Sequence, residues 1–437
     1  MSAPSSSIPK YATQTLDNGL QVVVVPMPNG TSVVSCDVLY KVGSGNEVMG
    51  KSGIAHMLEH LNFKSTKNLA AGDFDVEVKK YGGVNNASTS FDQTHYFIRS
   101  SKANLGRSLE LFAELMQNLS LKEEEFLPER DVVAEERRWR TDNNPMGYLY
   151  FKLFNLAFEY HPYHWTPIGF MNDIQTWDIE DIRAFHAMYY QPQNAVIVLS
   201  GDISTDEAFA LARKHFGAVA NRTSMVRDNI IDTLRTDMSK PHFVEPPQEG
   251  AKRAIIEKES EVEMLAIAFK TPNYAHEDQF ALSTISELLS AGKTGRLYQR
   301  IVDEKQLANQ IYGYNMELLD PGLFIIIAVC NAGVDATIVE AEIWKELEKL
   351  KKKALKEAEL AKVKRNIHSD FVFAFESASN VSDFIGSYFV KGNPAIIDTI
   401  EAKMQAVSAQ DIQRVAQTYF VEKISTTLIL KNPKEPK

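Results

Sequence analysis

Three residues with the chemistry of a metal site stand close together near the start of the chain. His56, Glu59 and His60 form the pattern His-x-x-Glu-His. On a helix, residues four positions apart share a face, and the two histidines would be separated by about 6 Å along the axis. Two imidazoles at that spacing can bind one zinc ion at about 2.0–2.1 Å each. Glu59 would lie within one turn of both, where its carboxylate could take a proton from a water molecule at the fourth position.

The alternative is an amphipathic helix whose histidines are ordinary surface or core residues. The residues around the motif argue against it because they are apolar, namely Ile54, Ala55, Met57, Leu58 and Leu61. A buried helix would leave two imidazoles and a carboxylate without partners, which is costly unless a metal ion satisfies them. The pattern therefore favours a metal site.

A catalytic zinc site needs a third protein ligand. Residues 121–140 have a helical pattern rich in glutamate, and Glu129 and Glu136 are spaced to share one face of that helix. Glu135 is a competing candidate next to Glu136. A helix with so many glutamates is also typical of an exposed surface helix, so the pattern alone leaves the third ligand open.

The elements that must position these residues can be read from turns and apolar runs. The sequence predicts strands at 20–26 and 32–40, then a glycine-containing loop before the histidine helix. The alternating stretch 84–99 predicts a strand beside the site. Helices are predicted at 104–119 and 176–190, and a further strand at 194–201.

The second half of the chain repeats the first at an offset of about 230 residues. The segment beginning at Trp177 matches the one beginning at Val407, and each is followed by an aromatic pair and a β-rich run. We therefore predict an α+β fold of two homologous domains, each an antiparallel-rich sheet covered by helices. The predicted boundaries are a disordered tail at 1–10, a first domain at 11–217, a linker at 218–250 and a second domain at 251–437.

The repeat also indicates which half holds metal. At the same offset, His56, Glu59 and His60 fall on Ile285, Leu288 and Leu289. These are core side chains that cannot bind zinc, so we expect a metal site in the first domain only.

Composition excludes several classes of protein. The chain has 437 residues, 44% of them hydrophobic, and a net charge of −10, which gives no electrostatic reason to expect nucleic-acid binding. No apolar run is long enough for a membrane-spanning helix. Cys36 and Cys330 each lie in an apolar run and are predicted to be buried free thiols. The first ten residues lack the pattern of a signal peptide, so we expect a cytoplasmic protein, or a periplasmic one if a leader has been removed.

Several motifs together resemble those of the pitrilysin/insulinase family of inverted zinc peptidases. They are His-x-x-Glu-His, Asn86-Ala87, Asp92-x-Thr94-x-Tyr96, Glu129-Arg-x-Val-Val-x-x-Glu136, and the segment 295–302. The domain repeat extends the resemblance over most of the chain. The size is similar to that of the branch containing mitochondrial processing peptidase and its bacterial relatives. In that branch two such chains close like a clam shell around a chamber.

The resemblance implies a role for each matching residue. His56, His60 and Glu136 correspond to the zinc ligands and Glu59 to the catalytic base. Glu129 corresponds to a second carboxylate that orients a histidine ligand.

Asn86 and Ala87 correspond to edge-strand positions that hold an extended peptide by main-chain pairing. An ordinary solvent-exposed edge is the alternative for this pair.

The resemblance also shows what is missing. Family members have an arginine that grips the substrate and a tyrosine that donates to the oxyanion, and here Val302 and Asn309 stand at those positions. We therefore predict the zinc-bearing catalytic subunit of a heterodimer, whose homologous partner chain carries the Arg/Tyr pair. The alternative is a homodimer that uses Lys305 with Tyr312, or the nearby Arg300.

A role of another class is a structural or core subunit of a larger complex with a peptidase-like fold. Such chains have usually lost zinc residues, whereas this one keeps the complete set. The sequence accordingly predicts a zinc metalloendopeptidase acting on peptides or unfolded segments.

Overall fold

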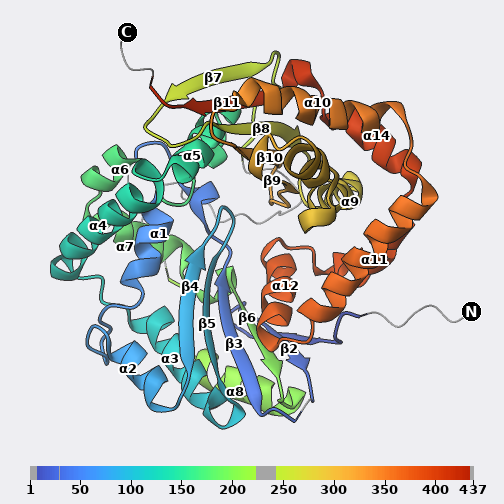
Figure 1. Ribbon diagram of the computed structural model, residues 1–437. Coiled ribbons are helices and arrows are strands. Elements are labelled where there is room, and N and C mark those ends of the chain that lie inside the picture. Colours follow the sequence, from blue (N-terminus) through green and yellow to red (C-terminus); the bar gives the residue numbers. More distant parts are fainter. Residues whose placement is uncertain (1–6, 29, 223–242, 434–437) are drawn as a thin grey trace, which may run out of the picture. The chain divides into compact units, whose positions relative to one another are not determined.

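The computed structural model describes residues 7–28, 30–222 and 243–433, which form two compact units (Figure 1). Each unit combines segments from both halves of the chain. The first contains the described residues of Met1–Glu135, Trp165–Met238 and Phe371–Asp398, and the second those of Glu136–His164, Ser239–Asp370 and Thr399–Lys437. No helix within the described ranges has both the length and the apolar character needed to cross a membrane.

The first unit is built on a six-stranded sheet with the order β1-β2-β6-β3-β5-β4. Its pairs are antiparallel except β2 with β6, which is parallel. The central strand β6 is buried along its whole length, since helices cover both faces of the sheet. The strands are β1 (Ala12–Thr15), β2 (Gln21–Pro26), β3 (Val33–Tyr40), β4 (Val84–Thr89), β5 (Thr94–Ser101) and β6 (Ala195–Gly201).

Alternation along β3 shows the two faces of this sheet. Cys36 and Val38 point into the main core of the unit, whereas Leu39 lies against Gly386 of α12 (Ala378–Val390). The other helices of the unit are α1 (Ile54–Leu61), α2 (Asp73–Lys80), α3 (Leu105–Asn118), α4 (Glu123–Arg137), α6 (Met171–Thr176), α7 (Ile179–Tyr189) and α8 (Thr205–Phe216). The last two residues of α4 are counted with the second unit.

The sheet of the second unit has the order β7-β11-β8-β10-β9, and it repeats the first sheet strand for strand apart from β1. The parallel pair β7–β11 corresponds to β2–β6, and the remaining pairs are antiparallel. The predicted α+β fold with two helix-covered, antiparallel-rich sheets is confirmed. The strands are β7 (Lys252–Glu257), β8 (Met264–Thr271), β9 (Ala308–Asn315), β10 (Gly322–Cys330) and β11 (Thr426–Lys431).

One helix of each half covers the sheet of the other half. Helix α5 (Pro145–Ala157) packs on β11 and β8, and α12 packs on β6 and β3. The compact units therefore differ from the predicted domains at 11–217 and 251–437. Residues 136–164 are grouped with the second sheet, and residues 371–398 are grouped with the first. The remaining helices of the second unit are α9 (Asp278–Ser290), α10 (Ala336–Lys352), α11 (Glu357–Ala374), α13 (Ile400–Ala406) and α14 (Ala409–Tyr419).

The predicted single strand at 84–99 is wrong, because the structure forms a hairpin of β4 and β5. The turn between them is closed by the Ser90 N–H, which donates to the Gln93 carbonyl at 2.8 Å, and serine and aspartate favour such turns. Most of the predicted tail at 1–10 and the middle of the linker at 218–250 lie outside the described residues.

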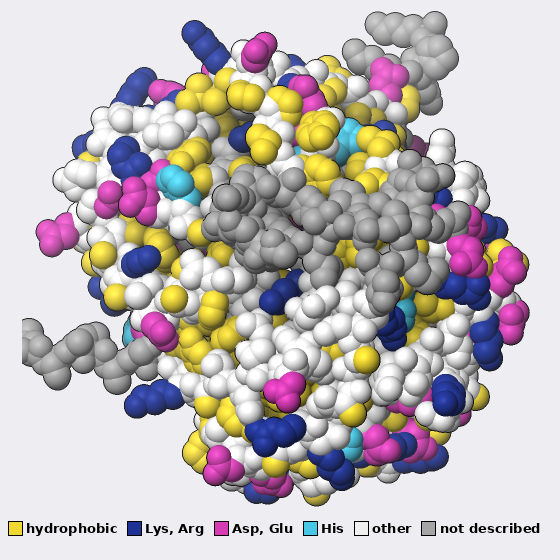
Figure 2. All heavy atoms as spheres, turned by 180° about the vertical axis from the view of Figure 1, so that it is seen from behind, with side chains coloured by type: hydrophobic (Ala, Val, Ile, Leu, Met, Phe, Trp, Pro, Cys, Tyr) yellow, Lys and Arg dark blue, Asp and Glu magenta, His cyan; other side chains and the backbone are white. Residues whose placement is uncertain are grey.

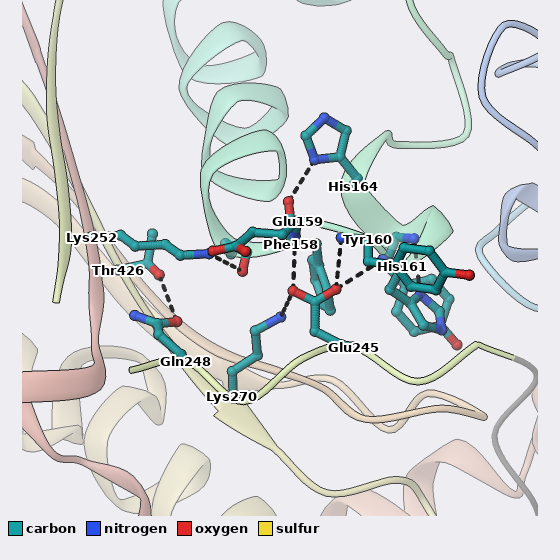
Figure 3. A network of polar contacts seen from close by, with 12 residues as sticks. Phe158, Glu159, Tyr160, His161, His164, Glu245, Gln248, Lys252, Lys270 and Thr426 are labelled. Atoms are coloured by element: carbon teal, nitrogen blue, oxygen red, sulfur yellow. Dashed lines mark hydrogen bonds and ion pairs between the residues drawn. The ribbon is translucent and has the colours of Figure 1, made fainter. Parts of the chain in front are cut away.

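The described chain resumes at residue 243, inside the predicted linker, and Glu245 holds it to the loop after α5 (Figure 3). Its carboxylate accepts the backbone N–H groups of Glu159, Tyr160 and His161 at 2.8–3.0 Å. It also pairs with the Lys270 ammonium at 3.3 Å, which lies over the Phe158 ring. The loop that follows α5 is therefore fixed by one half-buried carboxylate.

Charge is mixed on the surface. Figure 2 shows lysine and arginine side chains interspersed with aspartate and glutamate across the described part of one face. Interspersed charges of opposite sign give no extended region of one sign there.

Candidate metal centre

Helix α1 is buried on one side and carries the histidine motif on the other side. Ile54, Met57 and Leu58 are among its apolar residues and are fully buried, while His56, Glu59 and His60 are half-buried on the other side. This is the arrangement that the apolar flanks of the motif predict.

The start of α1 is fixed by a carboxylate that the sequence did not single out. Glu47 is buried, and its two oxygens accept the N–H groups of Gly53 and Ala55, each at 2.8 Å. These N–H groups have no partner within the helix, so the carboxylate caps it. Gly53 has a φ of 87°, and a Cβ there would lie 2.7 Å from the Ile168 carbonyl oxygen. Only glycine fits this position without strain.

His56, His60 and Glu136 come together into one potential metal-binding group. One ligand atom from each lies within 4.8 Å of the others, and the two imidazole centroids are 4.7 Å apart. Two imidazole nitrogens and one carboxylate oxygen are the donor set of a catalytic zinc site with an open fourth position. Glu136 belongs to this group, whereas its competitor Glu135 is exposed and does not.

Glu129 lies behind His60. Its Oε1 is 2.8 Å from His60 Nδ1, and its Oε2 is 2.5 Å from Lys64 Nζ. The hydrogen bond from His60, together with the Lys64 ammonium, lowers the pKa of Glu129 to about 2 despite the opposing effect of burial. An ionised carboxylate at Nδ1 accepts that proton and fixes the tautomer in which Nε2 of His60 can bind a metal ion.

We expect Glu129→Ala to weaken zinc binding about 10- to 100-fold, because His60 loses the group that fixes its tautomer and ring orientation. Competition with a chromophoric chelator measures this affinity. Glu124→Ala is the matched control, since Glu124 is exposed on the same helix. Equal zinc affinity in the two variants would show that Glu129 does not support the ligand.

Glu59 is held by a residue that sequence reasoning missed. The hydroxyl of Thr89 on β4 donates to Glu59 Oε2 at 2.5 Å. Thr89 and Ala87 are two residues apart and therefore share the inner face of the strand. This spacing was the available signal that Thr89 lies on the same side as Ala87. The contact holds Oε2 of Glu59 and so fixes the orientation of the carboxylate.

Thr89→Val keeps the shape of the side chain but removes the donor. We expect zinc content to stay the same and kcat/KM to fall about 10-fold, the usual effect of losing a hydrogen bond to a charged group. The control is Ser88→Ala, on the exposed face of β4. Steady-state kinetics on an unfolded peptide measure the effect. A wild-type kcat/KM in the Thr89→Val variant, as in the control, would contradict this role.

Strand β4 is at the end of the sheet order, as the peptide-binding prediction requires. Asn86 is exposed, and its Oδ1 accepts the Ala87 N–H at 2.9 Å. That N–H therefore points away from β5, toward the open edge. The geometry suits pairing with an extended peptide, and the binding role of both residues stays a prediction.

The chain is similar in sequence to known zinc proteases. Residues 22–159 match the family model described as insulinase (peptidase family M16), and residues 176–367 match the model described as peptidase M16 inactive domain. Over 427 residues the chain is 51% identical to the zinc protease PqqE of Helicobacter pylori, covering 98% of this chain and 94% of that protein. The chain belongs to the insulinase family, M16. The predictions of this family, of a zinc protease and of zinc as the cofactor are thereby confirmed.

Solved structures and more distant relatives support the same family. A crystal structure of a protease from Helicobacter pylori is 50% identical, with a TM-score of 0.92, and the match covers 98% of this chain and 100% of that one. The beta subunit of the mitochondrial-processing peptidase of Bos taurus is 25% identical over 427 residues, covering 95% of this chain and 83% of that subunit.

The match of the second half to an inactive domain agrees with its residues. Ile285, Leu288 and Leu289, which stand where the first half has its motif, are buried in α9.

Proposed function

We propose that this M16 chain is a zinc metalloendopeptidase that hydrolyses peptides or unfolded segments as the catalytic subunit of a heterodimer. The observation that carries the proposal is the group of His56, His60 and Glu136 beside a Glu59 carboxylate held by Thr89. The first three residues would hold zinc, which when bound supplies a Lewis acid that polarises the scissile carbonyl and acidifies water.

Glu59 performs the proton transfers. Its carboxylate accepts a proton from the attacking water, and the same carboxyl then gives the proton to the leaving nitrogen. Thr89 holds Oε2 throughout, so the acceptor oxygen stays in one orientation. Glu129 keeps His60 in the tautomer that can bind the metal ion.

The edge of β4 orients the substrate. An extended peptide adds to the sheet by main-chain hydrogen bonds with Ala87, after the Asn86 amide releases the Ala87 N–H. Because backbone pairing does not depend on side chains, this contact accepts many sequences. It requires an extended segment, which excludes folded proteins as substrates.

The heterodimer is supported by the ion pairs of Lys305 and Arg300, the residues that the homodimer alternative needs. Lys305 and Arg300, which a homodimer would use in place of the missing arginine, both pair with Glu342, at 2.9 and 3.2 Å. Val302 and Asn309 offer neither a cation nor a phenol at the two family positions. A homologous partner chain with an arginine and a tyrosine completes the site.

The test is to assay the purified chain on an unfolded peptide, alone and with similar-sized homologous chains that carry the Arg/Tyr pair. We expect about one equivalent of zinc per chain, turnover only with the correct partner, and loss of turnover with a zinc chelator. Added zinc should restore it. Full activity of the chain alone would overturn the heterodimer, and less than about half an equivalent of tightly bound zinc would favour a structural subunit.

A further inference from the structure

The second sheet lacks a counterpart of one strand of the first. Strand β1 pairs antiparallel with the outer edge of β2, whereas β7, the counterpart of β2, pairs only with β11 among the described strands (Figure 1). At the repeat offset of about 230 residues, β1 falls near residues 243–246. That stretch forms no strand, and Glu245 within it binds the loop after α5 instead (Figure 3). In the described part of the chain, the outer edge of β7 is therefore not covered by a strand.

The backbone of β7 points alternately toward β11 and toward this outer edge. The Lys252 N–H donates to the Ser425 carbonyl beside β11 at 2.9 Å. Every second residue of a strand directs its N–H and carbonyl groups the same way. Those of Arg253, Ile255 and Glu257 therefore point to the outer edge. An edge of this kind can pair with a strand of another chain.

The three outward-pointing residues complement themselves. Arg253 and Glu257 are exposed and oppositely charged, and they stand two positions on either side of Ile255, which is 58% exposed. If two such strands run antiparallel with Ile255 opposite Ile255, each Arg253 faces the Glu257 of the other copy. This register also brings the outward N–H and carbonyl groups together in hydrogen-bonded pairs. Sliding one strand by two residues would place Arg253 opposite Ile255 and lose both charge pairs.

Charged residues on an edge strand often serve to prevent pairing with another chain. Like charges that face each other give such protection, whereas the antiparallel register of β7 brings opposite charges together. Arg253 is also ordered in advance, since its guanidinium donates to both oxygens of Glu340 on α10, at 2.7 and 2.8 Å. A guanidinium has five N–H donors and can bind a second carboxylate. Pairing would therefore cost little side-chain freedom at Arg253.

We propose that two copies of this chain associate through β7, antiparallel and with Ile255 opposite Ile255, so that their second-unit sheets form one continuous sheet. A second copy is the partner that this edge fits, because the strand complements itself in charge and in hydrogen-bonding register. The inference goes beyond the proposed function and does not involve the metal centre. It is also separate from a homodimer that uses Lys305 and Tyr312, since β9, which carries Tyr312, is at the opposite end of the sheet order.

Sedimentation velocity of the purified full chain over a concentration series tests this association. We expect a monomer–dimer equilibrium. Ile255→Lys should raise the dimer dissociation constant at least about 10-fold, because two ammonium groups would replace a facing apolar pair. The matched control is Val84→Lys, since Val84 is 63% exposed on β4, the edge strand of the first sheet. It should dimerise like the wild type. A wild-type chain that stays monomeric at every concentration would overturn the inference.

Charge variants test the register. Arg253→Glu and Glu257→Arg should each raise the dimer dissociation constant at least about 10-fold, because both cross-strand charge pairs become repulsive. When the two variants are mixed, opposite charges face each other again, so they should associate with each other about as tightly as two wild-type chains. A fluorescent label on one variant follows this mixed dimer, and circular dichroism shows whether each variant is folded. Folded variants that do not associate when mixed would overturn the register.

A dimer that is insensitive to all the β7 variants would also overturn the inference, because it would form through another surface. The homodimer that uses Lys305 and Tyr312 would give that result. None of these measurements needs zinc or turnover. The association through β7 and the proposed peptidase function can therefore fail independently of each other.

Discussion

Glu59→Gln will retain zinc and lose nearly all turnover. The metal-binding group does not include Glu59, so the ligands are intact, but an amide cannot accept the proton from the attacking water. We expect kcat to fall about 100- to 10,000-fold, the usual contribution of a general base. Zinc is measured by elemental analysis and turnover by peptide cleavage in the presence of the partner chain.

The matched control is Glu124→Gln, which removes one exposed carboxylate from α4. It should behave like the wild type in both measurements. If Glu59→Gln keeps more than about a tenth of the wild-type activity, Glu59 is not the base. Removing a general base lowers the rate by about 100-fold or more.

His60→Ala will lose zinc as well as activity. It removes one of the three side chains of the candidate metal group. It also removes the imidazole that donates to the Glu129 carboxylate. Two remaining protein ligands do not hold a catalytic zinc ion tightly. After dialysis we expect well under a tenth of an equivalent of zinc and no measurable turnover.

The control for this variant is His368→Ala, because His368 is exposed and lies on α11, outside the metal group. Circular dichroism should show that both variants are folded. An unchanged zinc content in His60→Ala would mean that the metal binds elsewhere.

Much of the site could be predicted because its signal is local. The spacing of His56, Glu59 and His60 places them on one side of α1, and the apolar residues between them bury the other side. The internal repeat likewise predicted two homologous domains, and the two sheets have matching strand orders apart from β1. Glu136 needed the family resemblance, because nothing local distinguishes it from the adjacent Glu135.

What escaped prediction depends on contacts between distant residues. Helices α5 and α12 have ordinary helical patterns, and such patterns do not say which sheet a helix covers. Thr89 and Glu59 are thirty positions apart and meet only because β4 folds beside α1. The hairpin at Ser90 was missed because its turn contains neither glycine nor proline and lies within a continuous, mostly polar stretch.

The most direct test of the zinc site is X-ray diffraction from crystals of the purified chain, recorded above and below the zinc absorption edge. The account predicts one strong anomalous peak, present only above the edge, within about 2.0–2.2 Å of a nitrogen of His56, a nitrogen of His60 and an oxygen of Glu136. A zinc peak at other side chains, or no peak in crystals grown with added zinc, would contradict it.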